Sequence, residues 1–511
     1  MTAETPPDDQ SEAIAFLADP ASYAGLPVEH VETHGAHVFL VGDTALKVKR
    51  AVRYDYMDFS TLAKRQAMLQ RELELNHAAA PEIYRDLVAV TRESDGRLAL
   101  GGAGVPVEWA LRMRRFPAEA ELSAVAARGA LDDRLADELG RVVADYHERA
   151  ERREADASEL IASILRELRD AFGGMGDVFD ETRVRRFDMR ALEQLNVLTP
   201  LLKARTKTGD VRRVHGDLHL SNLVLIDGRP VPFDALEFDE RLGTCDVLYD
   251  LAFLLMDLCH RGLRRAANIT MGAYLFAAKG AQDDGLAALP LFMAVRAAIR
   301  AMVLVQTGRA RGDAVKMQAE AQQYLDEALA MLAPQTPRLI VVGGRSGTGK
   351  TALARGLAPE VGGVCGAVHL RSDLERKALA GVDVKVHLPP ETYTKETSDR
   401  VYARLFDRAD KLLRAGASVV LDAAFLDPAE RAMARALAAE RGVRFDGIWL
   451  EAPVEQLVAR VTARKGDASD ADAAVVRKQL GFDVGPVDWH VVDTSGAKEV
   501  TLGQARMALG L

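Results

Sequence analysis

A glycine-rich loop that ends in a lysine and a threonine most constrains what this chain can fold into. The segment from Gly344 to Thr351 fits the pattern G-x-x-x-x-G-K-[ST] without a mismatch. An apolar run at 339–342 predicts a buried strand before it, and residues 352–357 predict the first turns of a helix after it. Glycines let the backbone close around phosphates with its N–H groups inward, and the helix N-terminus adds a favourable dipole. This strand–loop–helix context predicts a nucleoside triphosphate site.

The residues of this loop have distinct expected roles at the phosphates and the metal. Lys350 is expected to reach the β- and γ-phosphates and to act in catalysis, and the Thr351 hydroxyl is expected to hold Mg²⁺. The residues predicted to bind the nucleotide are Gly344, Arg345, Ser346, Gly347, Thr348, Gly349, Lys350 and Thr351.

The composition is ordinary for a soluble globular chain, with 48% hydrophobic and 28% charged residues. The length of 511 residues allows two large domains or about three smaller ones. A net charge of -9 argues against non-specific nucleic-acid binding, which needs a basic face. The three cysteines, Cys245, Cys259 and Cys365, lack zinc-site spacing and fit a reducing compartment. We therefore expect a cytoplasmic protein that does not bind nucleic acid.

The sequence predicts no association with a membrane. Residues 1–9 are acidic and lack the apolar core of a signal peptide. The apolar run at 251–256 is too short to span a bilayer, and the run at 289–305 is broken by Arg296 and Arg300.

The part of the chain before the glycine-rich loop begins with short strands and continues mostly as helices. Residues 38–41 and 45–49 predict a β-hairpin around the turn Gly42-Asp43. A helix follows, and then a mixed pattern. The predicted elements are a helix at 60–76, strands at 87–90 and 98–100, a strand or hinge at 107–113, helices across 118–205, short strands and turns in 214–239, and helices from 246 to 332.

Residues 333–337, with prolines at 334 and 337, predict a linker between two domains. The domains are expected at 11–332 and 338–511. After the linker, strand and helix patterns alternate, which predicts an α/β domain with a parallel sheet covered on both faces. The predicted strands are 338–343, 367–370, 417–422, 445–450 and 489–492.

A second group of residues with kinase chemistry lies between the two helical stretches. Asp217 is followed five positions later by Asn222, and Asp234 comes twelve residues after that. Phosphoryl transfer in kinases uses one Asp to accept the proton of the attacking hydroxyl, and an Asn and a further Asp to hold Mg²⁺. Asp217 is therefore the predicted base, and Asn222 and Asp234 are the predicted metal ligands. The alternative is that the first two are turn residues and the third a helix cap.

A kinase-like small lobe also needs a strand lysine paired with a helix glutamate. Lys47 and Lys49 lie two positions apart and would face the same side of a strand, so alternation does not choose between them. Glu72 and Glu74 on the next helix leave the same choice open.

The segment Val214–Asn222, together with Asp234, Asp246 and Asp250, resembles the aminoglycoside phosphotransferases and related small-molecule kinases. The resemblance covers about residues 30–330. It implies an α+β, bilobal, protein-kinase-like fold.

The same resemblance implies that Lys47 contacts the phosphates and that Glu72 is its partner. The chain departs from the pattern at 32–37, where a G-x-G-x-x-G loop is absent. It also lacks an identifiable acidic substrate pocket, so aminoglycosides are not implied as substrates.

Residues 338–495 resemble P-loop small-molecule kinases such as gluconate kinase, chloramphenicol phosphotransferase and the zeta-toxin kinases. The resemblance implies that Asp373 contacts the substrate hydroxyl as the base, although the same residue could cap the next helix. It implies that Asp422, at the end of a Walker-B-like strand, orients magnesium. Arg460 and Arg464 resemble lid arginines that close over the phosphates, with a solvated basic face as the alternative. The polar segment at 467–472 is expected to form a mobile lid.

The order of the two parts resembles bacterial bifunctional aminoglycoside phosphotransferase/ATP-binding proteins. The chain is predicted to be a kinase with two sites, each using ATP or GTP with Mg²⁺ to phosphorylate a hydroxyl of a small molecule. One alternative makes the N-terminal part a regulatory module. Another makes the C-terminal part an NTP-driven switch, and a third, a nucleic-acid kinase, is disfavoured by the net charge. The sequence names neither acceptor and leaves the oligomeric state open.

Overall fold

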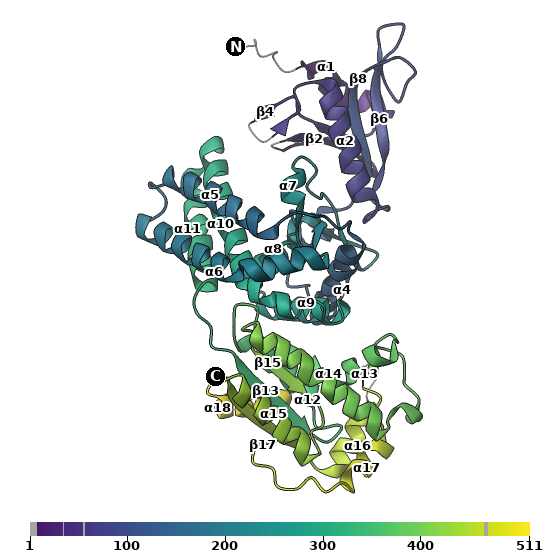
Figure 1. The fold of residues 1–511 in the computed structure, drawn as a ribbon. Helices are drawn as coiled ribbons and strands as arrows, with labels where there is room; N and C mark the ends of the chain where they lie inside the picture. The colour runs from purple at the N-terminus through teal and green to yellow at the C-terminus, as the bar shows by residue number, and fades with distance from the viewer. Residues whose placement is uncertain (1–7, 34, 55–56, 464–468) are drawn as a thin grey trace. The chain divides into compact units, whose positions relative to one another are not determined.

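The computed structural model describes residues 8–33, 35–54, 57–463 and 469–511 (Figure 1). The chain packs into two compact units. One comprises residues 1–160 and 203–254, and the other comprises 161–202 and 255–511. The predicted domain boundary at 333–337 stays a prediction.

A six-stranded antiparallel sheet forms the first part of the first unit. Its strand order is β1-β2-β3-β8-β6-β7. The predicted hairpin is confirmed, since Val41 pairs with Thr44 across the Gly42-Asp43 turn. The strands are β1 (Val28–Glu32), β2 (Ala36–Val41), β3 (Thr44–Lys49), β6 (Tyr84–Arg92), β7 (Leu98–Leu100) and β8 (Val105–Arg114).

The helix α2 (Leu62–His77) packs on β6 and β8 (Figure 1). Its buried Leu69 joins Tyr84 and Leu111 in one apolar cluster. The charged Glu72, on the same helix, is fully buried. This packing carries Glu72 to the sheet beside β3.

The rest of the first unit holds short antiparallel strand pairs among helices. The antiparallel pair β10 (Leu223–Ile226) and β11 (Arg229–Pro232) separates the segment 214–222 from Asp234. A second antiparallel pair joins β9 (Val211–Arg213) to β12 (Thr244–Asp246). The helices here are α1 (Ser11–Ala18), α3 (Leu122–Ala127), α4 (Asp133–Arg149) and α7 (Glu240–Gly243).

Helices open the second unit. The long helices α10 (Leu289–Arg311) and α11 (Ala314–Met331) pack on each other. The helical stretch Asp284–Ala310 is long and apolar enough to cross a membrane, but 67% of its apolar window is buried inside the protein, as in a soluble core helix. The other helices are α5 (Ala157–Gly173), α6 (Glu181–Thr208), α8 (Val247–His260) and α9 (Arg264–Ala277). The residues of α5, α6 and α8 are divided between the two units.

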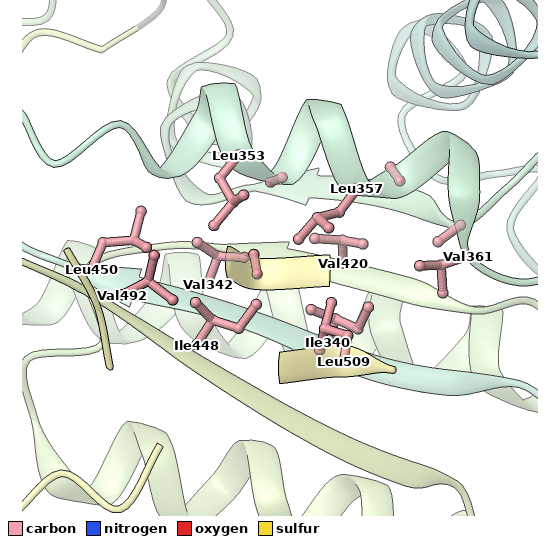
Figure 2. Close-up of a cluster of buried hydrophobic side chains, with 14 residues drawn as sticks. Ile340, Val342, Leu353, Leu357, Val361, Val420, Ile448, Leu450, Val492 and Leu509 are labelled. Atoms are coloured by element: carbon pink, nitrogen blue, oxygen red, sulfur yellow. The ribbon is translucent and has the colours of Figure 1, made fainter. Parts of the chain in front are cut away.

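The predicted α/β fold of the C-terminal part is confirmed. Its five strands are all parallel, in the order β14-β15-β13-β16-β17. Figure 2 shows Leu353 and Leu357 lying over Val342 and Val420 in the core of this part. The strands are β13 (Arg338–Gly344), β14 (Val368–Arg371), β15 (Val419–Asp422), β16 (Arg444–Glu451) and β17 (His490–Asp493).

Helices cover this parallel sheet. The helices α12 (Lys350–Leu357) and α18 (Lys498–Leu509) share one buried cluster with the strands. Because α12 starts where the loop after β13 ends, this packing fixes the glycine-rich loop at the carboxyl edge of the sheet. The remaining helices are α13 (Ser372–Ala380), α14 (Lys395–Arg414), α15 (Pro428–Glu440), α16 (Val454–Ala463) and α17 (Ala473–Leu480).

Candidate functional site

In the first unit, both candidate lysines meet the same glutamate. The Nζ atom of Lys47 lies 2.7 Å from Glu72 Oε1, and the Nζ atom of Lys49 lies 2.6 Å from Glu72 Oε2. Lys47 also lies 2.6 Å from Asp234 Oδ1. Glu74 is exposed and contacts its helix neighbours Gln70 and Arg71. The helix partner is therefore Glu72, and it bridges two lysines.

The charges of this group shift one another's proton affinity. Burial disfavours the charged form of Lys47, but Asp234 and Glu72 outweigh it and raise its pKa. Burial likewise disfavours the Asp234 carboxylate, but Lys47 outweighs it and lowers the pKa of Asp234. Both groups are therefore charged at neutral pH.

Sequence reasoning missed Glu237, which lies three residues after Asp234. Its Oε1 atom lies 2.6 Å from Lys49 Nζ. Burial raises the pKa of Glu237, although Lys49 opposes this shift. The Lys49–Glu237 pair ties the segment that carries Asp234 to strand β3. The sequence did hold a signal for Glu237: two lysines on the same face of one strand indicate that more than one carboxylate lies opposite them.

The predicted base and metal ligand of the second motif lie in one loop. The Nδ2 atom of Asn222 lies 2.9 Å from both the backbone oxygen and Oδ2 of Asp217. Asp250, fully buried, accepts backbone N–H groups from Gly216 at 2.8 Å and His215 at 3.3 Å. The structure thus brings Asp217 and Asn222 together, and the Asp250 carboxylate fixes their loop.

Asp234 has an unfavourable backbone conformation that its contacts hold in place. Its φ of +61° lies in the left-handed region, which is costly for a residue other than glycine. Its backbone N–H donates to the Tyr84 hydroxyl at 2.9 Å. The charge of Asp217 is near enough to oppose the lowered pKa of Asp234. The three predicted catalytic and metal-binding residues therefore share one region.

The oxygen atoms of Asn222 and Asp234 fit Mg²⁺, which binds through a few protein oxygens and takes its other ligands from water and phosphates. Within the described ranges, no group of three or more His, Cys, Asp and Glu side chains is arranged to hold a metal ion. The oxygens of Asn222 and Asp234 suit a metal that is also bound by nucleotide phosphates.

The glycine-rich loop of the second unit has the backbone that a phosphate cradle requires. Gly344 has φ +138° and Gly347 has φ +87°. A Cβ atom would lie 2.6 Å from the Leu450 oxygen at the first position and 2.7 Å from the Leu457 oxygen at the second. Both positions therefore exclude side chains. Lys350 Nζ donates to the Arg345 carbonyl at 3.0 Å, so the lysine folds back over the loop.

Asp422 contacts polar groups from two other elements, α12 and β14, at the carboxyl edge of the sheet. The Thr351 hydroxyl donates to its Oδ2 atom at 2.7 Å, and His369 Nε2 lies 3.3 Å from the same atom. Arg371, paired with Asp422 in register, has its Nε atom 3.7 Å away. Burial raises the pKa of this carboxyl, but His369, Arg371 and Lys350 outweigh it and lower it to about 2. The predicted ligands Thr351 and Asp422 are thus brought together.

His369 and Arg371 are residues of this site that sequence reasoning missed. They lie two apart on β14 and so face the same side of the strand, toward Asp422. The sequence signal for both residues was their alternate spacing on a strand that directly precedes the predicted base Asp373. Burial lowers the pKa of His369, although Asp422 opposes this shift, so its ring is neutral at pH 7.

Asp373 lies in the first turn of α13. The N-cap residue of this helix is Arg371, so the structure does not give Asp373 the capping role that was the alternative. Burial raises the pKa of Asp373, while Arg371 and Lys350 lower it and Asp422 raises it further. The pKa of Asp373 is therefore shifted by Arg371 and Lys350, which also shift the pKa of Asp422.

The predicted lid is described in part. Arg460 donates to the Thr494 carbonyl at 2.5 Å and contacts the Gly347 carbonyl at 3.5 Å, so it lies against the glycine-rich loop. Arg464 lies outside the described residues. Asp470 accepts from Lys377 Nζ at 2.7 Å and from the Tyr393 hydroxyl at 2.7 Å. This end of the lid segment is anchored to α13.

Two protein-family models match successive parts of this chain. The Phosphotransferase enzyme family model matches residues 38–289, and the AAA domain model matches residues 339–482. The chain is 32% identical over 489 residues to the uncharacterized proteins Rv2004c of Mycobacterium tuberculosis (strain H37Rv) and Mb2027c of Mycobacterium bovis. Each alignment covers 93% of this chain and 94% of the relative.

Solved structures are similar to one part of the chain or the other. Amicoumacin kinase hAmiN, in complex with AMP-PNP, Ca²⁺ and Ami, is 16% identical and covers 63% of this chain and 93% of its own, with a TM-score of 0.39. A gluconokinase from Sinorhizobium meliloti 1021 is 20% identical and covers 35% of this chain and 94% of its own, with a TM-score of 0.26.

Proposed function

Because this chain belongs to the family that joins an N-terminal phosphotransferase domain to a C-terminal P-loop kinase domain, we propose that it is a bifunctional ATP- and Mg²⁺-dependent kinase. Each site transfers the γ-phosphate to a hydroxyl of a small molecule. GTP is the alternative donor at either site. The protein is proposed to work in the cytoplasm, without nucleic-acid or membrane partners.

At the first site, Asp217 accepts the proton of the acceptor hydroxyl. Asn222, which contacts it, and Asp234 hold the metal, and Lys47 binds the phosphates. Bound Mg²⁺ would neutralise charge on the phosphates. The observation that carries this assignment is the contact of Lys47 with both Glu72 and Asp234, because it unites a strand, a helix and the loop after β11 in one charged centre.

At the second site, the glycine-rich loop and Lys350 hold the phosphates, and Thr351 and Asp422 hold the metal and its water. Asp373 accepts the proton of the acceptor hydroxyl. Arg460 and Arg464 close over the phosphates. The supporting observation is that the Thr351 hydroxyl meets Asp422 at 2.7 Å, since this joins the P-loop helix to the neighbouring strand.

A second reading makes the first unit a non-catalytic regulatory or binding module for the C-terminal P-loop kinase. The observation in its favour is the segment 32–37, which lacks the glycine loop that covers phosphates in kinases. The two readings differ in the number of nucleotide–Mg²⁺ sites per chain, which is two in the first reading and one in the second.

The decisive experiment counts bound ATP analogue per chain by calorimetry with Mg²⁺ present. Two sites are expected in the wild type, and one each in Asp234→Ala and Lys350→Ala. A single wild-type site that is lost with Lys350→Ala would rule out a nucleotide site in the first unit. ATP consumption measured with sugars, aminoglycosides, nucleosides and oligonucleotides then identifies the acceptors.

A further inference from the structure

A buried ion network crosses from the helical part of the second unit to helix α13. The guanidinium of Arg408 on α14 donates to Asp283 through Nε at 2.8 Å and through Nη2 at 2.9 Å. Its third nitrogen, Nη1, donates to Glu375 on α13 at 2.6 Å. Asp283, Glu375 and Arg408 are 0%, 1% and 3% exposed. One arginine therefore joins two carboxylates out of contact with water.

The backbone around Asp283 is shaped for this contact. Gly280 has φ +81°, and a Cβ atom there would lie 3.0 Å from both Arg408 Nε and Asp283 Oδ2. The carbonyl of Lys279 accepts from Arg404, whose Nε atom also donates to Glu375 at 2.5 Å. The turn after α9 thus supplies a carboxylate and a carbonyl to the arginines that hold Glu375.

A second contact reaches the strand that precedes α13. Asn268 on α9, 6% exposed, donates through Nδ2 to the Cys365 carbonyl at 2.7 Å and the Ala367 carbonyl at 2.8 Å. Ala367 is followed at once by β14, which carries His369 and Arg371 to Asp422. The helical part therefore contacts the residues just before β14 and the helix α13, whose first turn carries Asp373.

These contacts leave the P-loop part dependent on residues that precede the linker. Two arginines, Arg404 and Arg408, donate to Glu375 in this ion network. Asp283 is the second carboxylate of the network and binds Arg408. Removing one partner of a buried ion pair leaves a charge with no compensation, which is strongly destabilising. Glu375 lies two residues after Asp373 on α13, so loss of the network shifts the helix that carries the proposed base.

We propose that Asp283 is a positioning residue for the P-loop site, acting through Arg408 and Glu375 to hold α13 and its Asp373 against the acceptor. This inference rests on the proposed function of that site. It explains why the helical part and the P-loop part are joined in one chain: the first supplies a brace for the acceptor side of the second. A shift of about 1 Å in a reacting group can cost a hundredfold in rate.

The test compares Asp283→Asn with Asp446→Asn in the full chain. Asp446 forms a buried ion pair with Arg338 at 2.6 Å, on β16 and away from α13, and so controls for the loss of a buried charge. Hydrogen exchange is measured at residues 367–381 and at the P-loop helix 350–357. Asp283→Asn should speed exchange at 367–381 and leave 350–357 unchanged, whereas Asp446→Asn should leave 367–381 unchanged.

The kinetic arm uses ATP hydrolysis with water as acceptor, in an Asp217→Asn background that silences the first site. Asp283→Asn should lower kcat at least tenfold while the KM for ATP changes less than twofold, and Asp283→Glu should restore part of the loss. Unchanged exchange at 367–381 in Asp283→Asn overturns the proposal, whether or not the site is a kinase. Faster exchange with unchanged kcat overturns it too, while a wild type without turnover contradicts only the proposed function.

Discussion

The Oε2 atom of Glu72 lies 2.6 Å from Nζ of Lys49, while its other oxygen contacts Lys47. The Lys47 side chain is 14% exposed and the Lys49 side chain is 4% exposed. The two lysines therefore have separate roles. Lys47 faces the region where phosphates are expected, and Lys49 holds Glu72 and Glu237 inside the protein.

Substituting each lysine should separate these roles. Lys49→Met leaves Glu72 and Glu237 buried with one cation fewer, and should lower the free energy of unfolding by about 3–5 kcal/mol. Lys47→Met should cost less stability, because Lys49 still pairs with Glu72. It should weaken binding of an ATP analogue at the first site at least tenfold, about 1.4 kcal/mol. Chemical unfolding and calorimetry measure the two effects, and full nucleotide affinity in Lys47→Met would contradict the assignment.

Asp217→Asn should abolish phosphate transfer at the first site and leave nucleotide bound there. The amide keeps the size of the side chain but cannot accept a proton, while Asn222 and Asp234 still hold the metal. Transfer to a small-molecule acceptor is followed in the Lys350→Ala background, so that the second site is silent. Asp227→Asn, at an exposed hairpin turn, is the matched control and should keep full activity. Persistent transfer in Asp217→Asn would remove this residue from the mechanism.

Lys350→Ala should weaken nucleotide binding at the second site at least tenfold, about 1.4 kcal/mol, because the lysine charge at the phosphates is lost. Gly347→Ala should weaken it as well, since the added Cβ atom would lie 2.7 Å from the Leu457 oxygen and would force the loop to move. Titration of each variant with an ATP analogue in the Asp234→Ala background isolates this site. Equal affinity in wild type and Lys350→Ala would show that the loop does not bind phosphate.

The stability of the second unit should fall as pH rises toward neutrality because of Glu430. Burial raises the pKa of this carboxyl from 4.5 to about 7, and the nearby Asp427 and Asp399 add to the shift. Between these values the folded state binds more protons than the unfolded state, so stability decreases with pH. Glu430→Gln should therefore raise the melting temperature at pH 8 and leave it unchanged at pH 4.5. Glu440→Gln, exposed on the same helix, should show no such difference.

One result would contradict the prediction for Glu430. If Glu430→Gln has the same effect on the melting temperature at pH 4.5 and at pH 8, the carboxyl titrates alike in the folded and unfolded states.

The amino-acid sequence alone determined those features of the protein that are built from consecutive residues. The loop from Gly344 to Thr351 needs its glycines, its lysine and its flanking strand and helix, and all of these are consecutive. The hairpin at Gly42-Asp43 and the alternating strands after residue 337 follow for the same reason. The family resemblance around Asp217 and Asn222 likewise rests on a short segment.

Tertiary structure alone decided which charged groups meet. Two lysines at the same face of β3 and two glutamates on α2 give equivalent patterns, and only the packing of the helix buries Glu72 and exposes Glu74. His369 and Arg371 gain their place at Asp422 from the parallel register of β14 and β15. Asp283 and Arg408 are 125 residues apart, and no local pattern marks such a pair. Ion pairs depend on distance in space, which periodicity along a chain does not encode.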